Sequence, residues 1–375
     1  MIGKKLGGSS VAKYCLLFSL TNWFNLVYYP RTFSNVLETL IVLTIQLASL
    51  KLDKNSQYFW ITFAMFVSSA IRPTILVFFV PHLIKWFFDS QQKLRFVLHA
   101  LLSFGLAVLI QILIDYCYYG HFTFVLYNFI EFNFISGLSK FYGTHPVHWY
   151  LSEAIPAMLN LQLLPFLLYL TSNVDLFCLL ICIWPIFVFS LLGHKEMRFI
   201  LPILPTLSIF AAKGMPKIPL KARKIFLVIL VAVNVSFGIY MGLFHQSGTI
   251  SAMHHLRSTI TPQSMILNLM PCHSAPLQSI IHMDIPIIEL SCNPPLPGLD
   301  NSHDQNEFFN DPRKEVAKYI SSHSPSHFIL FECLEKEILD ILQQEMYEKC
   351  FEAFHAHLIL DSQRDGRVLI YCRKK

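Results

Sequence analysis

LRFVLHALLSFGLAVLIQILIDY, residues 94–116, is an apolar run whose charged side chains, Arg95 and Asp115, stand near its ends. It meets the requirement of about 20 residues for a helix that crosses the hydrocarbon core of a bilayer. In the whole chain of 375 residues, 54% are hydrophobic and 14% are charged, whereas soluble domains carry about 25% charged residues. This composition excludes a soluble globular enzyme and a disordered chain, and it predicts a polytopic α-helical membrane protein.

Similar apolar runs recur along the first two thirds of the chain. We predict nine membrane spans, at about residues 12–29, 35–50, 57–71, 74–89, 94–116, 157–172, 175–192, 198–213 and 225–244. After the last span the sequence becomes mixed and polar. The chain therefore divides into a transmembrane helical bundle, residues 1–244, with a long loop at 117–156, and an aqueous domain, residues 245–375.

The orientation of the bundle follows from its basic residues. With nine spans the two termini lie on opposite sides of the membrane. The loops on the side of the N-terminus carry most of the Lys and Arg residues, which is typical of cytosolic loops. The N-terminus is thus predicted to be cytosolic, and the loop 117–156 and the aqueous domain are predicted on the far, lumenal side.

The aqueous domain has the pattern of an α/β fold. Asp311 and Pro312 are typical of the start of a helix, predicted to run to residue 321, and a second helix is predicted at 334–347. Strands are predicted at residues 264–270, 281–290, 328–331, 351–360 and 368–372. No Gly-rich phosphate loop occurs, and the cysteines of this domain leave their disulfide pairing open.

Four polar clusters stand at the lumenal ends of the spans, where charged side chains are costly unless paired or in a wet cavity. The first is YYPRTFSN, residues 28–35, followed by Glu38. Arg31 and Glu38 are about two helical turns apart, and they either form a buried pair or bind a phosphate and a sugar. A turn with interfacial aromatic residues is the alternative. In the second cluster, RPT at 72–74, Arg72 either snorkels or lines a cavity.

The third cluster is YGTHPVHWY, residues 142–150, in the long loop. Aromatic faces stack on sugar C–H groups and imidazoles bond hydroxyls, so His145, His148 and Trp149 are candidates for sugar binding, with Tyr142 beside them. The alternative is a loop anchored at the membrane interface by its aromatic residues. The His-x-x-His spacing also suits a metal, but no third ligand is placed, so no metal site is predicted.

The fourth cluster, GHKEMRFILP at residues 193–202, crowds four ionisable side chains between two spans. Lys195 and Arg198 suit an anionic phosphate, which Arg can bind through two parallel hydrogen bonds. Glu196 is placed to hold one of these cations, and His194 precedes them. An ordinary charged turn is the alternative. Together the four clusters predict a site for a phosphate-bearing lipid and a polar headgroup.

The fourth cluster resembles the HKExRF…P motif of the mannosyltransferases of the endoplasmic reticulum (ER) that use dolichyl-phosphate mannose, glycosyltransferase family 22 of the GT-C class. The run RTFSN at 31–35 with Glu38 resembles an early element of the same family. The loop 142–151 and the tail stretch LMPCHSAP, 269–276, resemble the branch that adds the third mannose of GPI anchors. The resemblance extends over almost the whole chain.

This resemblance implies a GT-C-like bundle with a lumenal α/β domain in the ER membrane. It implies transfer of mannose in α-1,2 linkage from dolichyl-phosphate mannose to a GPI precursor glycolipid, by an inverting mechanism without metal or cofactor. A carboxylate would act as base, and basic groups would stabilise the leaving phosphate. By the same resemblance, Lys195 and Arg198 would bind the donor phosphate. Sugar or acceptor would be oriented by His145, His148 and Trp149. The bilayer and the two lipid-linked substrates are the expected partners, with no nucleic acid.

The family's catalytic acid stands in an H-x-D-E-like motif, and no such motif occurs in residues 1–375. We therefore expect that an N-terminal span and its loop are absent, and we leave the catalytic residues unassigned. Glu38, Glu131 and Glu153 are not obvious substitutes. Two alternatives stay open: a non-catalytic membrane subunit that binds lipid-linked substrate, and an α-mannosyltransferase of N-glycan precursor assembly. A transporter is disfavoured because no inverted repeat is detectable.

Overall fold

The computed structural model describes the chain except residues 50–57, 295, 297–302, 358–362, 365 and 375. The chain divides into two compact units, Met1–Gly238 and Ile239–Lys375. This division lies a few residues before the predicted one at 244/245. Each unit has its own core, and each is described by itself.

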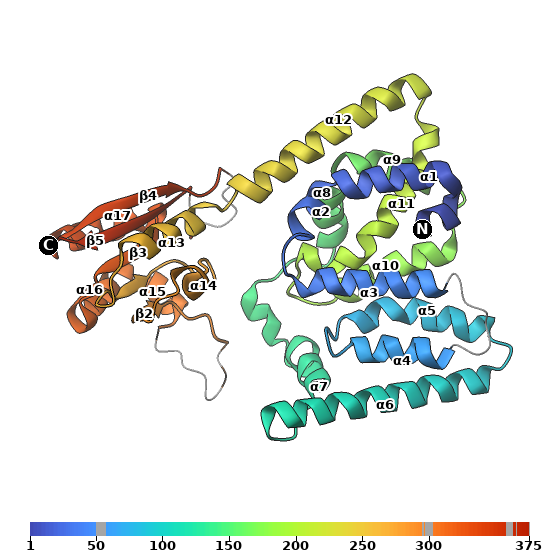
Figure 1. The fold of residues 1–375 in the computed structure, drawn as a ribbon, viewed down its shortest axis with the longest axis horizontal. Helices are drawn as coiled ribbons and strands as arrows, with labels where there is room; N and C mark the ends of the chain where they lie inside the picture. Colours follow the sequence, from blue (N-terminus) through green and yellow to red (C-terminus); the bar gives the residue numbers. More distant parts are fainter. Residues whose placement is uncertain (50–57, 295, 297–302, 358–362, 365, 375) are drawn as a thin grey trace. The chain divides into compact units, whose positions relative to one another are not determined.

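The first unit consists of helices (Figure 1). Its α-helices are α1 (Ile2–Thr21), α2 (Trp23–Tyr28), α3 (Ser34–Ser49), α4 (Tyr58–Ser68), α5 (Ile75–Asp89), α6 (Lys93–Tyr119), α7 (Val125–Ile130), α8 (Ile155–Leu159), α9 (Leu163–Leu170), α10 (Leu176–Ser190), α11 (Leu204–Gly214) and α12 (Leu220–Ile239), which reaches the second unit. Short helical turns connect several of them: η1 (Glu131–Ile135), η2 (Leu138–Tyr142), η3 (Tyr150–Ala154), η4 (Asn160–Gln162), η5 (Met197–Ile203) and η6 (Met215–Lys217).

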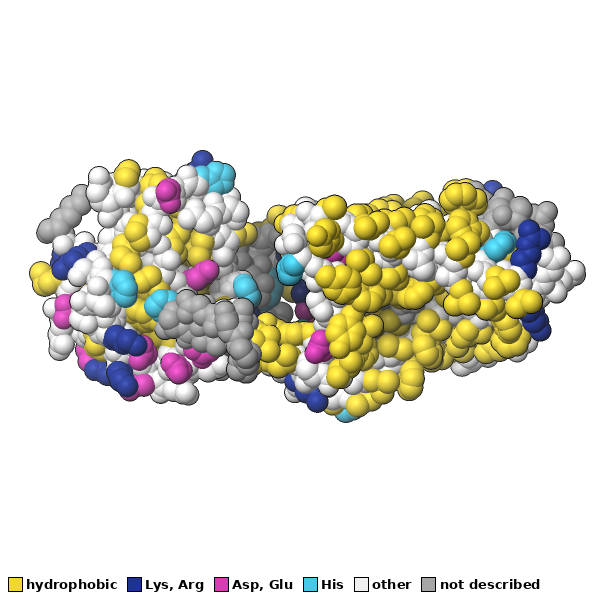
Figure 2. Space-filling model, turned by 90° about the horizontal axis from the view of Figure 1, so that it is seen from below, with side chains coloured by type: hydrophobic (Ala, Val, Ile, Leu, Met, Phe, Trp, Pro, Cys, Tyr) yellow, Lys and Arg dark blue, Asp and Glu magenta, His cyan; other side chains and the backbone are white. Residues whose placement is uncertain are grey.

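Among the described residues, helices and helical turns occupy most of each predicted span, but the segments differ in length. Among the described residues, four segments are long and apolar enough to cross a membrane: Lys93–Tyr119, Tyr150–Leu170, Met197–Lys217 and Leu220–Thr259. Along α6 the exposed side chains include leucines at positions 94, 98, 101, 102, 106, 109 and 113. Figure 2 shows hydrophobic side chains over much of the visible face of this unit. Such a surface suits lipid rather than water, and the protein is a multi-pass membrane protein.

Two of the predicted boundaries change in the structure. The predicted span 12–29 is interrupted at Asn22, because the Asn22 side chain accepts hydrogen bonds from the backbone amides of Phe24 and Asn25 and so caps α2. The Asn22 amide also donates to the carbonyl of Met158 at 2.8 Å, which links this break to α8. The predicted loop 117–156 is largely helical: it contains α7, η1, η2 and η3.

Gly214 sets the distance between α11 and α9. A Cβ atom at this position would lie 1.8 Å from the carbonyl oxygen of Pro165. This oxygen belongs to the backbone of α9, so no change of side-chain rotamer can relieve the clash. We expect Gly214→Ala to lower the thermal stability of the purified protein, by about 1–3 kcal/mol or more in unfolding free energy. Gly105→Ala in α6 is the matched control, since nothing lies within 4 Å of its Cβ. Equal melting temperatures for both variants would contradict this packing.

The second unit contains a five-stranded sheet. Its strands are β1 (Ile266–Asn268), β2 (Ile287–Glu289), β3 (His327–Phe331), β4 (Tyr347–Phe354) and β5 (Arg367–Arg373), in the order β2-β1-β3-β5-β4. β1 pairs in parallel with β2 and β3, whereas β5 pairs antiparallel with β3 and β4. The helical elements are η7 (Tyr240–Phe244), α13 (Gly248–Thr259), α14 (Leu277–Ile281), α15 (Gln305–Asn310), α16 (Pro312–His323) and α17 (Glu332–Gln344).

Two hydrophobic cores cover the two faces of this sheet. Side chains of α15, α16 and α17 pack with Phe328 and Leu330 of β3, and side chains of α13 and α14 pack with Ile329 and Phe331. β3 is apolar at successive positions because helices cover both faces. Two disulfides, Cys272–Cys292 and Cys350–Cys372, join segments of this unit.

The α/β pattern of this unit agrees with the prediction, and several details differ. α16 begins at Pro312 with Asp311 accepting from the Lys314 amide, as the capping pattern predicted. The predicted strand 281–290 is wrong in its first part, because Ile281 ends α14 and β2 begins at Ile287. The predicted helix 334–347 ends at Gln344, and Tyr347 opens β4. The last part of the predicted strand 351–360, residues 358–360, lies outside the described residues.

Candidate active site

Two loops that are far apart in the sequence are joined by their backbones and by one lysine. The His145 amide donates to the carbonyl of Gly193 at 3.1 Å. The Lys195 ammonium donates to the carbonyl of His145 at 2.8 Å and to that of Leu192. Lys195 is only 2% exposed, and this burial lowers the pKa of its ammonium. Its hydrogen bonds therefore hold the third cluster against the fourth.

His194 strengthens the same junction. Its Nδ1 lies 3.2 Å from the carbonyl oxygen of Gly143, and its Nε2 lies 3.3 Å from a carboxylate oxygen of Glu196. Both partners are acceptors, so both ring nitrogens donate only when the ring is protonated. The hydrogen bond with Glu196 is the main cause that raises the pKa of His194 above its ordinary value, against the opposing effect of burial.

Arg198 is the most accessible cation of the fourth cluster. Its Nη2 donates to Oε1 of Glu196 at 2.8 Å, and its Nε lies at ion-pair distance, 2.5 Å, from Oε2. Its guanidinium also lies over the ring of Phe33, 5.2 Å from the centroid. The Arg198 side chain is 34% exposed. The direction of the guanidinium is therefore fixed, and part of the Arg198 side chain stays accessible to a ligand.

Glu196 carries a negative charge at this position. Burial by itself would raise its pKa, but the hydrogen bonds from His194 and Arg198 and their charges outweigh burial and lower the pKa to about 2. The Tyr150 hydroxyl donates to the backbone carbonyl of Glu196 at 3.3 Å. Glu196 therefore orients Arg198, as the sequence predicted for one of its two neighbouring cations.

The first and second clusters meet at a buried carboxylate. Glu38 is 0% exposed, and Oε2 lies 3.1 Å from Nε of Arg72. The Thr74 hydroxyl donates to Oε1 at 2.7 Å, and the Asn35 amide lies 3.4 Å from Oε2. The predicted alternative of a pair between Glu38 and Arg31 is wrong, because the carboxylate faces Arg72 and Arg31 is exposed.

Trp149 does not present a free face for a sugar. The ring is 6% exposed, and the imidazole of His145 stacks on it at a centroid distance of 4.3 Å. By contrast, His145, His148 and Tyr142 are exposed, and Tyr142 lies edge-on to His194. The exposed members of the loop are the ones able to contact an acceptor.

The structure joins all four clusters through specific contacts. Arg72 and Phe33 belong to the predicted clusters, but the sequence did not single them out as substrate-binding residues. The sequence did contain a signal for Arg72. A carboxylate in an apolar span needs a cation at the same membrane face, and Arg72 stands at the end of the neighbouring spans that the sequence predicts to be lumenal. No comparable pattern pointed to Phe33, whose role depends on the packing of α3 against η5.

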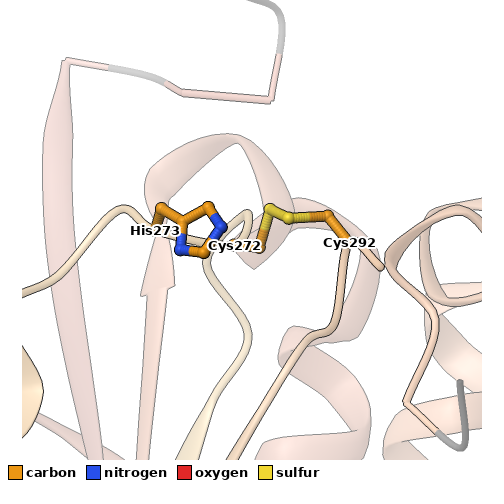
Figure 3. Close-up of side chains that lie close together, drawn as sticks. All are labelled: Cys272, His273 and Cys292. Atoms are coloured by element: carbon orange, nitrogen blue, oxygen red, sulfur yellow. A yellow bond between two sulfur atoms is a disulfide. The ribbon is translucent and has the colours of Figure 1, made fainter. Parts of the chain in front are cut away.

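One group in the described part of the chain brings metal-ligand atoms together, at Cys272, His273 and Cys292. Figure 3 shows that the two sulfurs are bonded to each other, with His273 beside them. Metal ligation requires thiolates, which a disulfide does not supply. This group is therefore a covalent link between the segments that follow β1 and β2 rather than a metal centre.

The link between His194 and Glu196 makes loop stability dependent on pH. Because the pKa of His194 is raised in the folded state, its protonation stabilises the folded protein. This stabilisation is fully present below the unfolded pKa of about 6.5, and it is lost as the pH rises through the folded pKa. We expect the melting temperature of the wild-type protein to fall more between about pH 6 and pH 9 than that of His194→Gln. If the melting temperatures of the two proteins change with pH in parallel, His194 does not stabilise the fold as an imidazolium bonded to Gly143 and Glu196.

Comparison with known proteins identifies the family. Residues 1–282 match the Alg9-like mannosyltransferase family. The chain belongs to this family. Its relatives include "GPI alpha-1,2-mannosyltransferase 3" of Bos taurus, 32% identical over 99% of the chain and 70% of the relative, and that of Mus musculus, 33% identical over 94% and 67%. "GPI mannosyltransferase 3" of Candida albicans is 35% identical over 96% of the chain and 75% of the relative.

The fold resembles that of a solved GT-C membrane glycosyltransferase. ArnT from Cupriavidus metallidurans, bound to undecaprenyl phosphate, superposes with a TM-score of 0.58 at 12% identity, covering 98% of this chain and 80% of ArnT. Its apo form gives a TM-score of 0.55. Family membership and the relatives' names make this protein a mannosyltransferase, and they confirm the resemblance of the HKEMRF motif to glycosyltransferase family 22.

Proposed function

We propose that this protein transfers the third mannose, in α-1,2 linkage, from dolichyl-phosphate mannose to a GPI-anchor precursor in the ER membrane. The observation that carries the proposal is the agreement among relatives. GPI mannosyltransferases 3 from mammals and yeast match at 32–35% identity over at least 94% of the chain. The matched region includes the four clusters that the structure joins.

The chemistry of the joined clusters suits this transfer. Breaking the bond between mannose and phosphate leaves negative charge on the phosphate, which a preoriented cation stabilises more in the transition state than in the ground state. Arg198 is such a cation, since Glu196 and Phe33 fix its direction and a third of its side chain is exposed. We assign the donor phosphate to Arg198.

Lys195 has a different role in this proposal. Its ammonium is buried against backbone carbonyls, so it acts as a positioning residue that holds the loop 142–150 beside Arg198. The exposed side chains of that loop, His145, His148 and Tyr142, are then placed to orient the acceptor. This division of roles revises the expectation from the sequence that Lys195 and Arg198 both bind phosphate.

The disulfides support a lumenal location of the second unit. Cys272–Cys292 and Cys350–Cys372 are bonds that persist in oxidising compartments such as the ER lumen and are rare in the cytosol. This placement agrees with the excess of basic residues in the loops on the side of the N-terminus. We therefore place the joined clusters and the second unit on the lumenal side.

Complementation tests the proposed function. Cells that lack the third GPI mannosyltransferase would receive residues 1–375, either alone or joined to the parts of the mouse relative that lie outside the matched region. Restoration of GPI-anchored proteins at the cell surface by either form would support the proposal. Failure of both forms, with the protein detected in the ER, would overturn it, and the N-glycan precursors of the same cells would then be analysed.

A further inference from the structure

The second unit contains a small polar pocket that the proposed transfer does not use. Its volume is about 130 Å³. Its described lining residues are Gln246, Thr249, His273, Ser274, Phe331, His355 and Arg364. A single water needs roughly 10–15 Å³ of such space, so a group of several heavy atoms fits. His273 and Ser274 belong to the tail stretch LMPCHSAP. The fold explains its core residues and Cys272, but neither the fold nor the transfer site gives a reason for His273 and Ser274.

Among the described residues, two side chains of this pocket each have a buried polar atom without a hydrogen-bond partner in the structure. These atoms are Nδ1 of His355, a residue that is 4% exposed, and Oγ of Ser274. The His355 ring is held by Phe331, at a centroid distance of 4.9 Å, and its backbone bonds Gln246 and Gly366. An unsatisfied buried polar atom is destabilising, and a ligand that accepts or donates here would remove that cost.

The charges around the pocket favour an anion. Among the described residues, the lining contains imidazoles, a guanidinium, hydroxyls and an amide, and no Asp or Glu. Burial, followed by the positive charges of His245 and Arg364, lowers the pKa of His355 to about 4, so its ring is neutral near pH 7 and can donate one hydrogen bond. A phosphate oxygen accepts such a bond, and the positive potential that opposes protonation of His355 attracts the anion.

The start of α13 adds a second source of positive potential. Thr249 lies in the first turn of this 12-residue helix and lines the pocket. Ser247, at the N-cap position, makes no side-chain capping bond to this turn, and its hydroxyl donates to the carbonyl of Phe244 at 2.8 Å. The first amides of a helix and its dipole attract anions. In α13 these amides receive no hydrogen bond from the N-cap side chain.

We propose that this pocket binds a phosphate group. Ser274, Thr249 and the first turn of α13 would donate to its oxygens, with Arg364 and His355 supplying the remaining contacts. Such a group is present both in free phosphate esters and in the headgroups of phospholipids. The inference goes beyond the proposed mannose transfer and does not depend on it, since binding is measured without any turnover.

Calorimetric titration of the full chain in an uncharged detergent tests the proposal. The probes are inorganic phosphate, O-phosphoethanolamine as a soluble monoester, and a short-chain phosphatidylethanolamine as a lipid diester, with mannose as the neutral control. We expect saturable binding of a phosphate probe and none of mannose. The tightest of the three probes identifies the source, free or lipid-borne.

Variants connect the binding to the pocket. Arg364→Gln is expected to weaken the binding about tenfold or more, because a hydrogen bond to a charged group is lost, and Ser274→Ala to weaken it about fivefold. Matched controls are Arg313→Gln, on a surface ion pair with Asp340, and Ser279→Ala, an exposed serine of α14. If one pocket variant fails to fold, the other still decides. No saturable binding of any phosphate probe, or binding that neither pocket variant weakens, would overturn the proposal.

Discussion

Replacing Arg198 by glutamine should lower the rate of mannose transfer by about 100- to 1000-fold, the range seen when one charge-stabilising donor is removed from an active site. The reason is that Arg198 is the partly exposed, directionally fixed cation of the joined clusters. Arg198→Lys should recover only part of the rate, because an ammonium cannot reproduce the planar fork that Glu196 and a phosphate share. The measurement is transfer from dolichyl-phosphate mannose to a precursor with two mannoses, in membranes from rescued cells.

Two controls separate charge stabilisation from folding. Arg95→Gln changes an exposed arginine at the start of α6, which bonds Gln92, and should leave the rate unchanged. Lys195→Met removes the buried ammonium between the two loops, and it should lower the melting temperature, which Arg198→Gln should alter little. A normal transfer rate in Arg198→Gln would remove Arg198 from the donor site.

Replacing Arg72 by leucine should destabilise the first unit by roughly 3–5 kcal/mol, the cost of leaving a buried charge without its partner. Glu38 has no exposed surface, and its carboxylate depends on Arg72 together with the Thr74 hydroxyl and the Asn35 amide. Thermal unfolding of the purified protein measures the effect. Glu38→Gln should cost less, because an amide keeps part of the hydrogen bonding without the charge.

The double variant Glu38→Leu/Arg72→Leu is the matched control for this pair. Removing both charges takes away the desolvation cost together with the attraction, so replacement of a buried pair by apolar residues is often close to neutral. We expect the double variant to be more stable than Arg72→Leu alone. If the two proteins melt at the same temperature, Arg72 and Glu38 are not coupled across α3 and the α4–α5 connection.

Much of the architecture was predictable because it depends on local sequence properties. Length and apolarity identify α6 as a membrane helix without reference to any other residue. The Asp311–Pro312 cap likewise predicted the start of α16. The break at Asn22 was missed because a capping side chain within an apolar run hardly alters its hydropathy. α14 was missed because a five-residue helix bounded by prolines and turn residues has too little periodicity to stand out.

The candidate site was predictable in its residue types and less so in its contacts. The HKEMRF motif contains Arg198 and Glu196, and their pairing follows from short spacing along the chain. Trp149 and His145 were predicted as sugar ligands, yet they stack on each other. Spacing alone could not show this, because an aromatic ring in a loop serves equally as a binding face or as packing.

The sequence by itself determined the membrane class, the α/β pattern of the tail and the family, because each depends on composition, periodicity or a contiguous motif. The tertiary structure alone decided which cation faces Glu38, that Lys195 is buried between two loops, and that Phe33 lies against Arg198. These are contacts between segments tens to more than a hundred residues apart. Several partners of suitable charge or shape exist for each side chain, and only the packing of the helices selects among them.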